Sequence, residues 1–264
     1  MTHSARSIVR RTTDDDGVCW ITLDDPSTRN ALSDALLDQL LEHLAVAAGD
    51  AEVRVVVLGS SHEKVFSSGG DLKAFAGDAP TIEKLAGLDR FPRLFETIGG
   101  LGKPVICAAS GDVLAGAFGL ALACDLIIAK EGVKFGCPEI NVGVFPFMIS
   151  ALIFRNLPRM KANELMMLGR PIDADEAKRL DIVNAVVRED EFAETVCEWA
   201  RSLAEKSPLL MRLGKDAIHA TRDMGQSAAL DALRAQLALA FTTDDIKEGV
   251  QAFREGRRPQ WSNR

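Results

Sequence analysis

Hydrophobic residues follow two alternating patterns over the first 190 positions of the chain. Leucines after Ser33, a good helix N-cap residue, recur at helical spacing. Thr81–Ile98 and Ala115–Ala123 are also helical in pattern. Short, β-branched and nearly continuous apolar runs predict strands buried on both faces: Val53–Leu58, Pro104–Ala109 and Leu126–Ala129. This alternation predicts an α/β fold with parallel sheets.

The two ends of the chain differ from this pattern. Near the start, Val18–Leu23 follows the turn signal Asp14–Gly17 and is predicted to pair with Ile8–Arg11 as a hairpin. After Val187 the pattern is helical throughout, in Glu191–Ala204, Pro208–Ala220, Gln226–Thr243 and Asp244–Arg254. We therefore expect an α/β core over residues 1–190 and an all-helical region over 191–264.

Composition narrows the class of protein. The chain has 264 residues, of which 47% are hydrophobic, enough for one large core. A net charge of −7 argues against binding to a nucleic-acid backbone. The five cysteines are irregularly spaced, as is typical of free thiols in a reducing compartment. Met1–Thr13 has no apolar stretch suited to a signal peptide, and no run suits a membrane helix, so we expect a cytoplasmic protein with no membrane partner.

Three stretches carry candidate chemistry. In Val65–Lys73, a strand end runs into two glycines and then Asp71, a pattern that aims backbone N–H groups outward at a helix start. Lys103–Asp125 combines a buried strand with a helix of very small residues, which leaves first-turn N–H groups uncovered. In Lys134–Gly143, Glu139 is the one acidic residue of an apolar loop, where desolvation would raise its pKa. Taken singly, each has an ordinary structural explanation.

Together and in this order, the stretches resemble the crotonase superfamily, the enoyl-CoA hydratase/isomerase family. Phe66–Lys73 matches its F-x-x-G-x-D-[LI]-K pattern, and Phe135–Gly143 matches F-G-x-P-E-I-x-x-G. Between them, Lys103–Asp125 matches its K-P-V-I strand, small-residue helix and A-C-D. Asn30-Ala31-Leu32 and the segment from Glu248 to Phe253 are also similar to family segments, so the resemblance spans nearly the whole chain.

The resemblance implies a fold, an assembly and a site. The fold would be a crotonase-like spiral of ββα units with a C-terminal all-helical trimerisation region, assembled as a homotrimer or homohexamer. The backbone N–H groups of Gly70 and Gly116 would form an oxyanion hole for the carbonyl of an acyl-CoA thioester. Ser68, Asp71, Leu72 and Lys73 fall where the family binds coenzyme A.

The resemblance is less complete at the acid–base groups. Family hydratases carry two glutamates, one three residues beyond the oxyanion glycine and one in the P-E-I loop. Here the second is Glu139, but the first position is Gly119. Because one glutamate suffices to move a proton between two carbons, this favours isomerisation of 3-enoyl-CoA to 2-enoyl-CoA. Phe145 and Phe147, in a bulky loop unlike the hydratase type, are candidates to line the acyl pocket, or plain core.

Two alternatives remain open from the sequence. One is a 2-enoyl-CoA hydratase that uses Glu139 with a substitute group; Asp112 is the main candidate, with Asp78 and Glu83 also open. Asp125 is expected instead to cap backbone groups. The other is a non-catalytic subunit that binds CoA thioesters. No metal or organic cofactor is implied, since none of the four histidines shows metal or triad spacing and the thioester itself accepts electrons.

Overall fold

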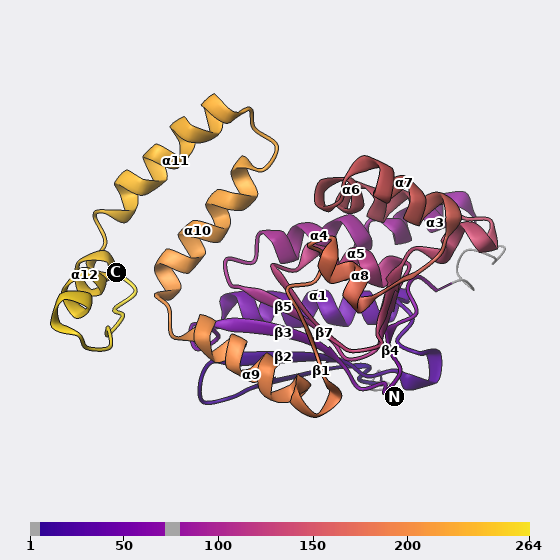
Figure 1. The fold of residues 1–264 in the computed structure, drawn as a ribbon, viewed down its shortest axis with the longest axis horizontal. Coiled ribbons are helices and arrows are strands. Elements are labelled where there is room, and N and C mark those ends of the chain that lie inside the picture. The colour runs from indigo at the N-terminus through magenta and orange to yellow at the C-terminus, as the bar shows by residue number, and fades with distance from the viewer. Residues whose placement is uncertain (1–5, 72–79) are drawn as a thin grey trace.

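Two β-sheets form the centre of the protein. The computed structural model describes residues 6–71 and 80–264 (Figure 1). In spatial order, the strands of the six-stranded sheet are β1 (Val9–Thr13), β2 (Val18–Leu23), β3 (Val55–Ser60), β5 (Val105–Ala109), β7 (Leu126–Lys130) and β10 (Ala185–Val187). Those of the four-stranded sheet are β4 (Val65–Ser67), β6 (Asp112–Leu114), β8 (Lys134–Gly136) and β9 (Ile172–Asp173).

Strand direction agrees with the sequence prediction. β1 and β2 form the expected antiparallel hairpin, and the pairs β2–β3, β3–β5, β5–β7 and β7–β10 are parallel. All five residues of β5 are buried. Ile106 and Ala108 contribute to one hydrophobic cluster and Val105, Cys107 and Ala109 to another, so both faces of this strand are covered.

Helices pack on both faces of the larger sheet and continue beyond it. They are α1 (Asp34–Gly49), α3 (Thr81–Leu88), α4 (Arg90–Gly99), α5 (Gly116–Ala123), α6 (Phe147–Asn156), α7 (Arg159–Leu168), α8 (Ala174–Arg179), α9 (Glu189–Ala204), α10 (Pro208–Thr221), α11 (Gln226–Ala240) and α12 (Asp244–Glu255). Short 3-10 helices cover Pro26–Thr28 and Pro138–Val142. Within the described residues, no helix combines the length and apolar character needed to cross a membrane.

The helix predicted over 81–98 is divided into α3 and α4 at Asp89. Pro92 explains the break, because it lacks the N–H that would bond to the carbonyl of Leu88 in a continuous helix. The prediction for α1 is confirmed: the hydroxyl of Ser33 accepts a hydrogen bond from the N–H of Leu36 at 3.3 Å, and the leucine stripe is buried.

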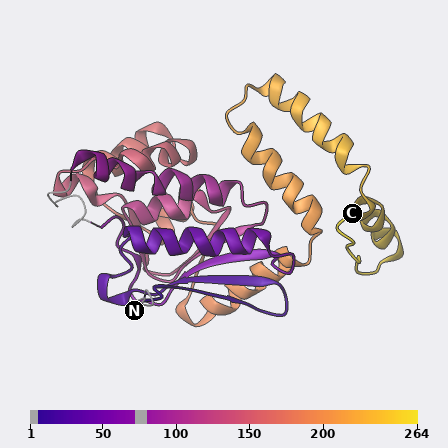
Figure 2. The same ribbon diagram turned by 180° about the vertical axis from the view of Figure 1, so that it is seen from behind.

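The C-terminal helices differ in how they contact the rest of the protein. α9 packs on the larger sheet through Val196 and Ala200, which contact Val18, Val55 and Val57. α10 is tied to the sheet by Lys215, which donates to the carboxylate of Asp125 at 2.6 Å and to the carbonyl of Lys103 at 2.9 Å. Beyond it, α11 and α12 extend away from the α/β body as an arm (Figure 2).

Candidate active site

The candidate site forms where β4 and β6 end side by side. They are parallel neighbours in the smaller sheet, with Ser67 opposite Val113. Because parallel strands present their carboxyl ends at the same edge, the turns that follow them meet there. The turn after β4 contains Gly70, and the turn after β6 enters α5 at Gly116.

These two turns are in direct main-chain contact, which requires glycine. Gly69 has a φ of +85°, and a Cβ there would lie 2.4 Å from the Cβ of Ala115 and 2.9 Å from the nitrogen of Gly116. A Cβ on Gly116 would lie 3.4 Å from the nitrogen of Gly70. The close approach therefore depends on a residue at position 69 that has no side chain.

The entry to α5 has a strained backbone. Ala115 has φ 54° and ψ −131°, a region that only glycine adopts readily, at a cost of order 1–3 kcal/mol for other residues. Two hydrogen bonds hold it there: its N–H donates to the carbonyl of Gly136 at 2.8 Å, and its carbonyl accepts from Phe118 at 2.8 Å. This backbone conformation of Ala115 turns the chain sharply from β6 into α5 and brings Gly116 beside Gly70.

The N–H groups of Gly70 and Gly116 have no hydrogen-bond acceptor among the described residues. Gly116 is the first residue of α5, and the first N–H groups of a helix have no partner within it. Both glycines line a cavity. A pair of uncovered N–H donors in an apolar cavity is suited to stabilising an oxygen on which negative charge develops.

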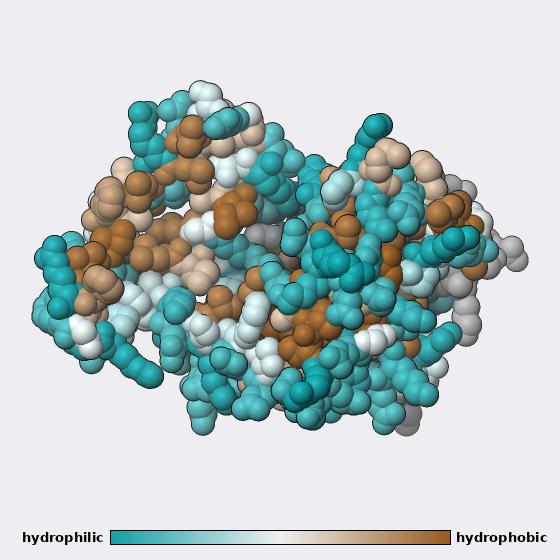
Figure 3. Space-filling view, viewed as in Figure 1, coloured by the Kyte–Doolittle hydropathy of each residue, from teal (hydrophilic) through white to brown (hydrophobic). Residues whose placement is uncertain are grey.

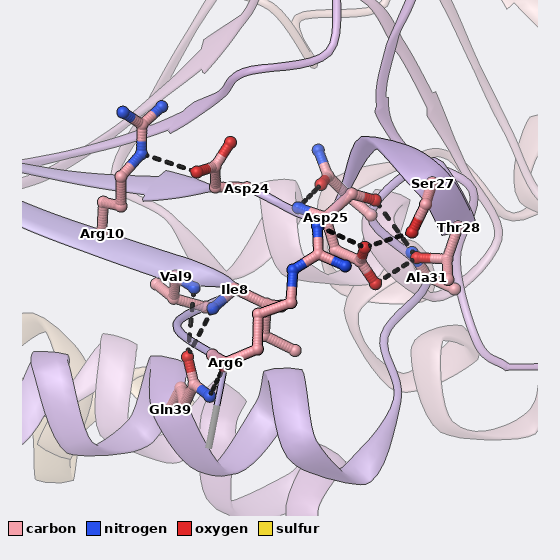
Figure 4. A network of polar contacts seen from close by, with 11 residues as sticks. Arg6, Ile8, Val9, Arg10, Asp24, Asp25, Ser27, Thr28, Ala31 and Gln39 are labelled. Atoms are coloured by element: carbon pink, nitrogen blue, oxygen red, sulfur yellow. Dashed lines mark hydrogen bonds and ion pairs between the residues drawn. The ribbon is translucent and has the colours of Figure 1, made fainter. Parts of the chain in front are cut away.

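Figure 4 shows a polar network around Asp25, after β2. Through Asn30 this network supports the strand that leads to the turn with Gly70. The carboxylate of Asp25 accepts from Ser27 at 2.6 Å and Thr28 at 2.8 Å, bonds that lower its pKa, the one from Ser27 most. The N–H of Asp25 donates to the side chain of Asn30 at 2.7 Å. Asn30 is buried and donates to the carbonyl of Phe66, the middle residue of β4, at 3.0 Å.

The residues after Asn30 continue this support. The N–H of Leu32 donates to the carbonyl of Gly69 at 2.8 Å, and the hydroxyl of Ser67 donates to the carbonyl of Asn30 at 2.7 Å. The Asn30-Ala31-Leu32 segment therefore holds the main chain of the turn that contains Gly69 and Gly70.

Glu139 is the candidate proton carrier. It lies in the 3-10 helix after β8 and lines the cavity. One of its carboxylate oxygens, Oε2, is buried without a hydrogen-bond partner. Burial raises the pKa of Glu139 to about 7, although a hydrogen bond from its own backbone acts in the opposite direction. A carboxyl with a pKa near neutrality both accepts and returns protons efficiently, as expected from the loop sequence.

The cavity joins the candidate groups in one space of about 380 Å³, within the usual range for small-molecule sites. Ser68, Phe145 and Phe147 line it, so these three residues share one space with Glu139. Sequence reasoning missed other lining residues, notably Leu88 and Phe91. Their spacing along the predicted helices is the same for residues that line a ligand pocket and for residues of a hydrophobic core.

Other predicted residues lie elsewhere. Asp112 does not line the cavity: its carboxylate accepts a hydrogen bond from the N–H of Lys134 at 2.9 Å. Asp125 accepts from the N–H of Val105 at 2.7 Å, so its predicted capping role is confirmed. Asp71 is described but is absent from the cavity lining. Leu72, Lys73 and Asp78 lie outside the described residues, and so does the side chain of Glu83.

The space beside Gly119 is filled by other side chains. A Cβ on Gly119 would lie 2.3 Å from Cγ2 and 2.9 Å from Cβ of Ile149, and 3.0 Å from Cζ of Phe95. Ile149 belongs to α6, is only 3% exposed and lines the cavity. A hydrophobic side chain therefore occupies the space into which any side chain at position 119 would extend. Among the described lining residues, Glu139 is the only carboxylate.

Sequence comparison gives relatives along nearly the whole chain. A profile of the family Enoyl-CoA hydratase/isomerase matches residues 13–264. The 2,3-dehydroadipyl-CoA hydratase of Escherichia coli strain K12 is 32% identical over 250 residues, covering 94% of this chain and 96% of that protein. The carnitinyl-CoA dehydratase of Salmonella typhi is 36% identical over 250 residues, covering 92% of this chain and 94% of that protein.

Solved structures agree with these relatives. The enoyl-CoA hydratase of Mycobacterium smegmatis superposes with a TM-score of 0.93 at 30% identity, covering 97% of this chain and 99% of that one. An enoyl-CoA hydratase from Bacillus anthracis gives a TM-score of 0.93 at 31% identity, covering 98% and 100%. The parallel sheets and C-terminal helices are thus those of the crotonase fold, and the chain belongs to the enoyl-CoA hydratase/isomerase family of acyl-CoA enzymes.

Proposed function

We propose that this enzyme isomerises 3-enoyl-CoA thioesters to 2-enoyl-CoA thioesters, with Glu139 as its one acid–base group. The observation that carries this proposal is the filling of the Gly119 position by Ile149 and Phe95. That arrangement leaves neither the second carboxylate nor the space for one, whereas proton transfer between two carbons needs one carboxylate only.

The proposed reaction conserves all atoms. The carboxylate of Glu139 removes a proton from C2 of the 3-enoyl group, and the C–H electron pair moves toward the thioester oxygen to give a dienolate. The N–H groups of Gly70 and Gly116 stabilise the negative oxygen. Glu139 then returns the proton to C4, and the double bond ends between C2 and C3. Beyond the coenzyme A of the substrate, the reaction needs no cofactor, because the thioester carbonyl accepts the electrons.

A 2-enoyl-CoA hydratase is the second candidate. It is favoured by the names of two relatives, which are a hydratase and a dehydratase. In this case Glu139 would act with a substitute group that holds the attacking water. Asp112 is the candidate from the sequence, but its carboxylate accepts a hydrogen bond from Lys134.

One assay distinguishes these reactions. The purified protein is incubated in H₂¹⁸O with 3-hexenoyl-CoA and, separately, with 2-hexenoyl-CoA, and the products are identified by mass spectrometry. Isomerase activity converts 3-hexenoyl-CoA to 2-hexenoyl-CoA without uptake of ¹⁸O. Rapid formation of ¹⁸O-labelled 3-hydroxyhexanoyl-CoA from the 2-enoyl substrate would instead favour the hydratase. Binding of both thioesters without turnover would overturn both and favour a non-catalytic CoA-thioester-binding subunit.

We further propose that the protein assembles as a homotrimer or a dimer of trimers through its arm. Hydrophobic side chains gather along the arm in the space-filling view (Figure 3). Leu230, Leu237 and Phe241 are exposed there, although large apolar side chains are normally buried. Sedimentation equilibrium measures the molecular mass of the assembly, and Leu237→Glu is expected to lower that mass.

The cytoplasmic location expected from the sequence stays a proposal. The five cysteines, which are free thiols, support it.

A further inference from the structure

The cavity beside Glu139 has an unusually uniform lining. Most of its described lining residues have apolar side chains. On α3, α4 and α6, in the 3-10 helix and in the loop before α6, these are Leu88, Phe91, Val142, Val144, Phe145, Phe147, Met148 and Ile149. The polar lining side chains among the described residues are those of Ser68, Glu139 and Asn141. A hydrocarbon group would find contacts on most sides of this space.

Glu139 is the only charged side chain among the described lining residues. Burial raises its pKa to about 7, and no cation among the described residues counteracts that shift. A second carboxylate in the same cavity would therefore lose its hydration without gaining a positive partner, and it would repel Glu139 when that group is ionised.

The rim of the cavity is also apolar. Phe147 is 74% exposed, Val142 is 59% exposed and Met148 is 37% exposed, and all three line the cavity. The ring of Phe147 lies 5.3 Å from that of Phe145, measured between centroids, which continues the apolar wall inward. The far end of an acyl chain would thus meet hydrophobic side chains at the rim as well as inside.

We infer that the acyl group of the substrate is a hydrocarbon chain without a second carboxylate, and that the cavity discriminates against dicarboxylic acyl groups of the same length. This inference rests on the proposed acyl-CoA function of the cavity and adds its substrate class. It separates this protein from the 2,3-dehydroadipyl-CoA hydratase of Escherichia coli, whose named substrate carries a carboxylate at the far end of its acyl chain.

The test compares two unreactive ligands of equal length, hexanoyl-CoA and adipoyl-CoA, which differ at the terminal carbon of a six-carbon chain. Isothermal titration calorimetry with the full-length protein at pH 8 gives the two dissociation constants, and free coenzyme A serves as the reference. Hexanoyl-CoA is expected to bind at least tenfold more tightly than adipoyl-CoA, a difference of about 1.4 kcal/mol. Equal affinities for the two thioesters would overturn the inference.

A matched pair of variants locates the effect. Phe147→Arg places a cation at the rim, and because Phe147 is exposed the fold is expected to persist. The preference for hexanoyl-CoA over adipoyl-CoA should fall at least threefold in this variant. Phe154→Arg is the control, because Phe154 is also exposed on α6 but lies outside the cavity lining, and its preference should remain that of the wild type. Equal effects of the two variants would overturn the placement of the acyl chain.

The binding test is independent of the proposed reaction. Both ligands are saturated thioesters and undergo neither isomerisation nor hydration. A protein that prefers hexanoyl-CoA but does not isomerise 3-hexenoyl-CoA would contradict the proposed function and support the acyl preference. A protein that isomerises 3-hexenoyl-CoA but binds adipoyl-CoA as tightly as hexanoyl-CoA would support the proposed function and contradict the acyl preference.

Discussion

The Cγ2 methyl of Ile149 lies 2.3 Å from the point that a Cβ on Gly119 would occupy. The contact joins α5 and α6, which pack closely together in this fold. It makes glycine at position 119 a packing requirement of this protein.

The first prediction concerns this contact. Gly119→Ala should lower the free energy of unfolding by about 1–3 kcal/mol through overpacking, despite the better helix propensity of alanine. Gly214→Ala is the control, since Gly214 also lies in a helix but has nothing within 4 Å of its Cβ position. This control should gain up to about 1 kcal/mol. Urea denaturation measures both, and a stabilising Gly119→Ala would contradict the packing described.

The second prediction concerns catalysis by Glu139. Glu139→Gln should lower kcat for 3-hexenoyl-CoA isomerisation by about 10²–10⁴-fold, because the amide neither accepts nor returns the proton. Asp112→Asn is the matched control and should keep nearly wild-type activity, since an amide oxygen still accepts from Lys134. Steady-state kinetics of both variants tests the assignment, and a comparable loss in Asp112→Asn would favour the hydratase alternative.

The third prediction is the pH dependence of activity. Burial raises the pKa of Glu139 to about 7. A group that begins the reaction as a base must be ionised in the free enzyme, so kcat/KM should fall as pH decreases through 7. The profile should approach a slope of one below that pH. A profile that stays flat from pH 8 to pH 5 would show that another group starts the reaction.

The same carboxyl should affect stability with the opposite trend. The pKa of Glu139 is about 7 in the folded protein and near 4.5 in a solvated chain. Between these values the unfolded chain releases a proton that the folded protein keeps, so rising pH favours unfolding, and the effect is complete above pH 7. Glu139→Gln should therefore be more stable than wild type at pH 8, by about 1–3 kcal/mol, and nearly equal at pH 4.5. Thermal denaturation at both pH values measures the difference.

The fifth prediction concerns the glycine turn. Gly69→Ala should reduce kcat by about 10²–10³-fold, because its methyl group would collide with Ala115 and displace the N–H donors. Gly132→Ala is the control: Gly132 has a similar positive φ of +80°, but nothing lies near its Cβ position. It should lose about 1 kcal/mol of stability and no activity. If both variants lost activity equally, the turn would not determine the donor geometry.

Much of the larger sheet was predictable from the sequence because its strands are continuous apolar runs that must be covered on both faces. Of the smaller sheet, only the strand end at Val65 was predicted, since β4, β6, β8 and β9 have two or three residues each, too few to establish a periodicity. The break between α3 and α4 was missed although Pro92 marks it.

Some residues of the candidate site were likewise predictable from the sequence, and others were not. Glu139 was a candidate from its loop sequence, and Gly70 and Gly116 were candidates from the family resemblance; the structure places all three around one cavity. The raised pKa of Glu139 follows from its burial. The filling of the Gly119 position was not predictable, because it depends on how α6 packs against α5, and Ile149 lies 30 positions further along the chain. The same holds for Phe91, which reaches the cavity only through tertiary packing.

The spacing of the two N–H donors is set by the ladder between β4 and β6 and by backbone conformation, whereas the acyl chain is proposed to meet side chains of separate helices. In the proposed function, polarisation of the thioester carbonyl and choice of the acyl group therefore depend on different parts of the chain. Directed evolution that varies α3, α4 and α6 should therefore change which thioester is accepted and keep the N–H groups of Gly70 and Gly116 in place. Insertions or deletions between the ends of β4 and β6, by contrast, should abolish every thioester reaction at once.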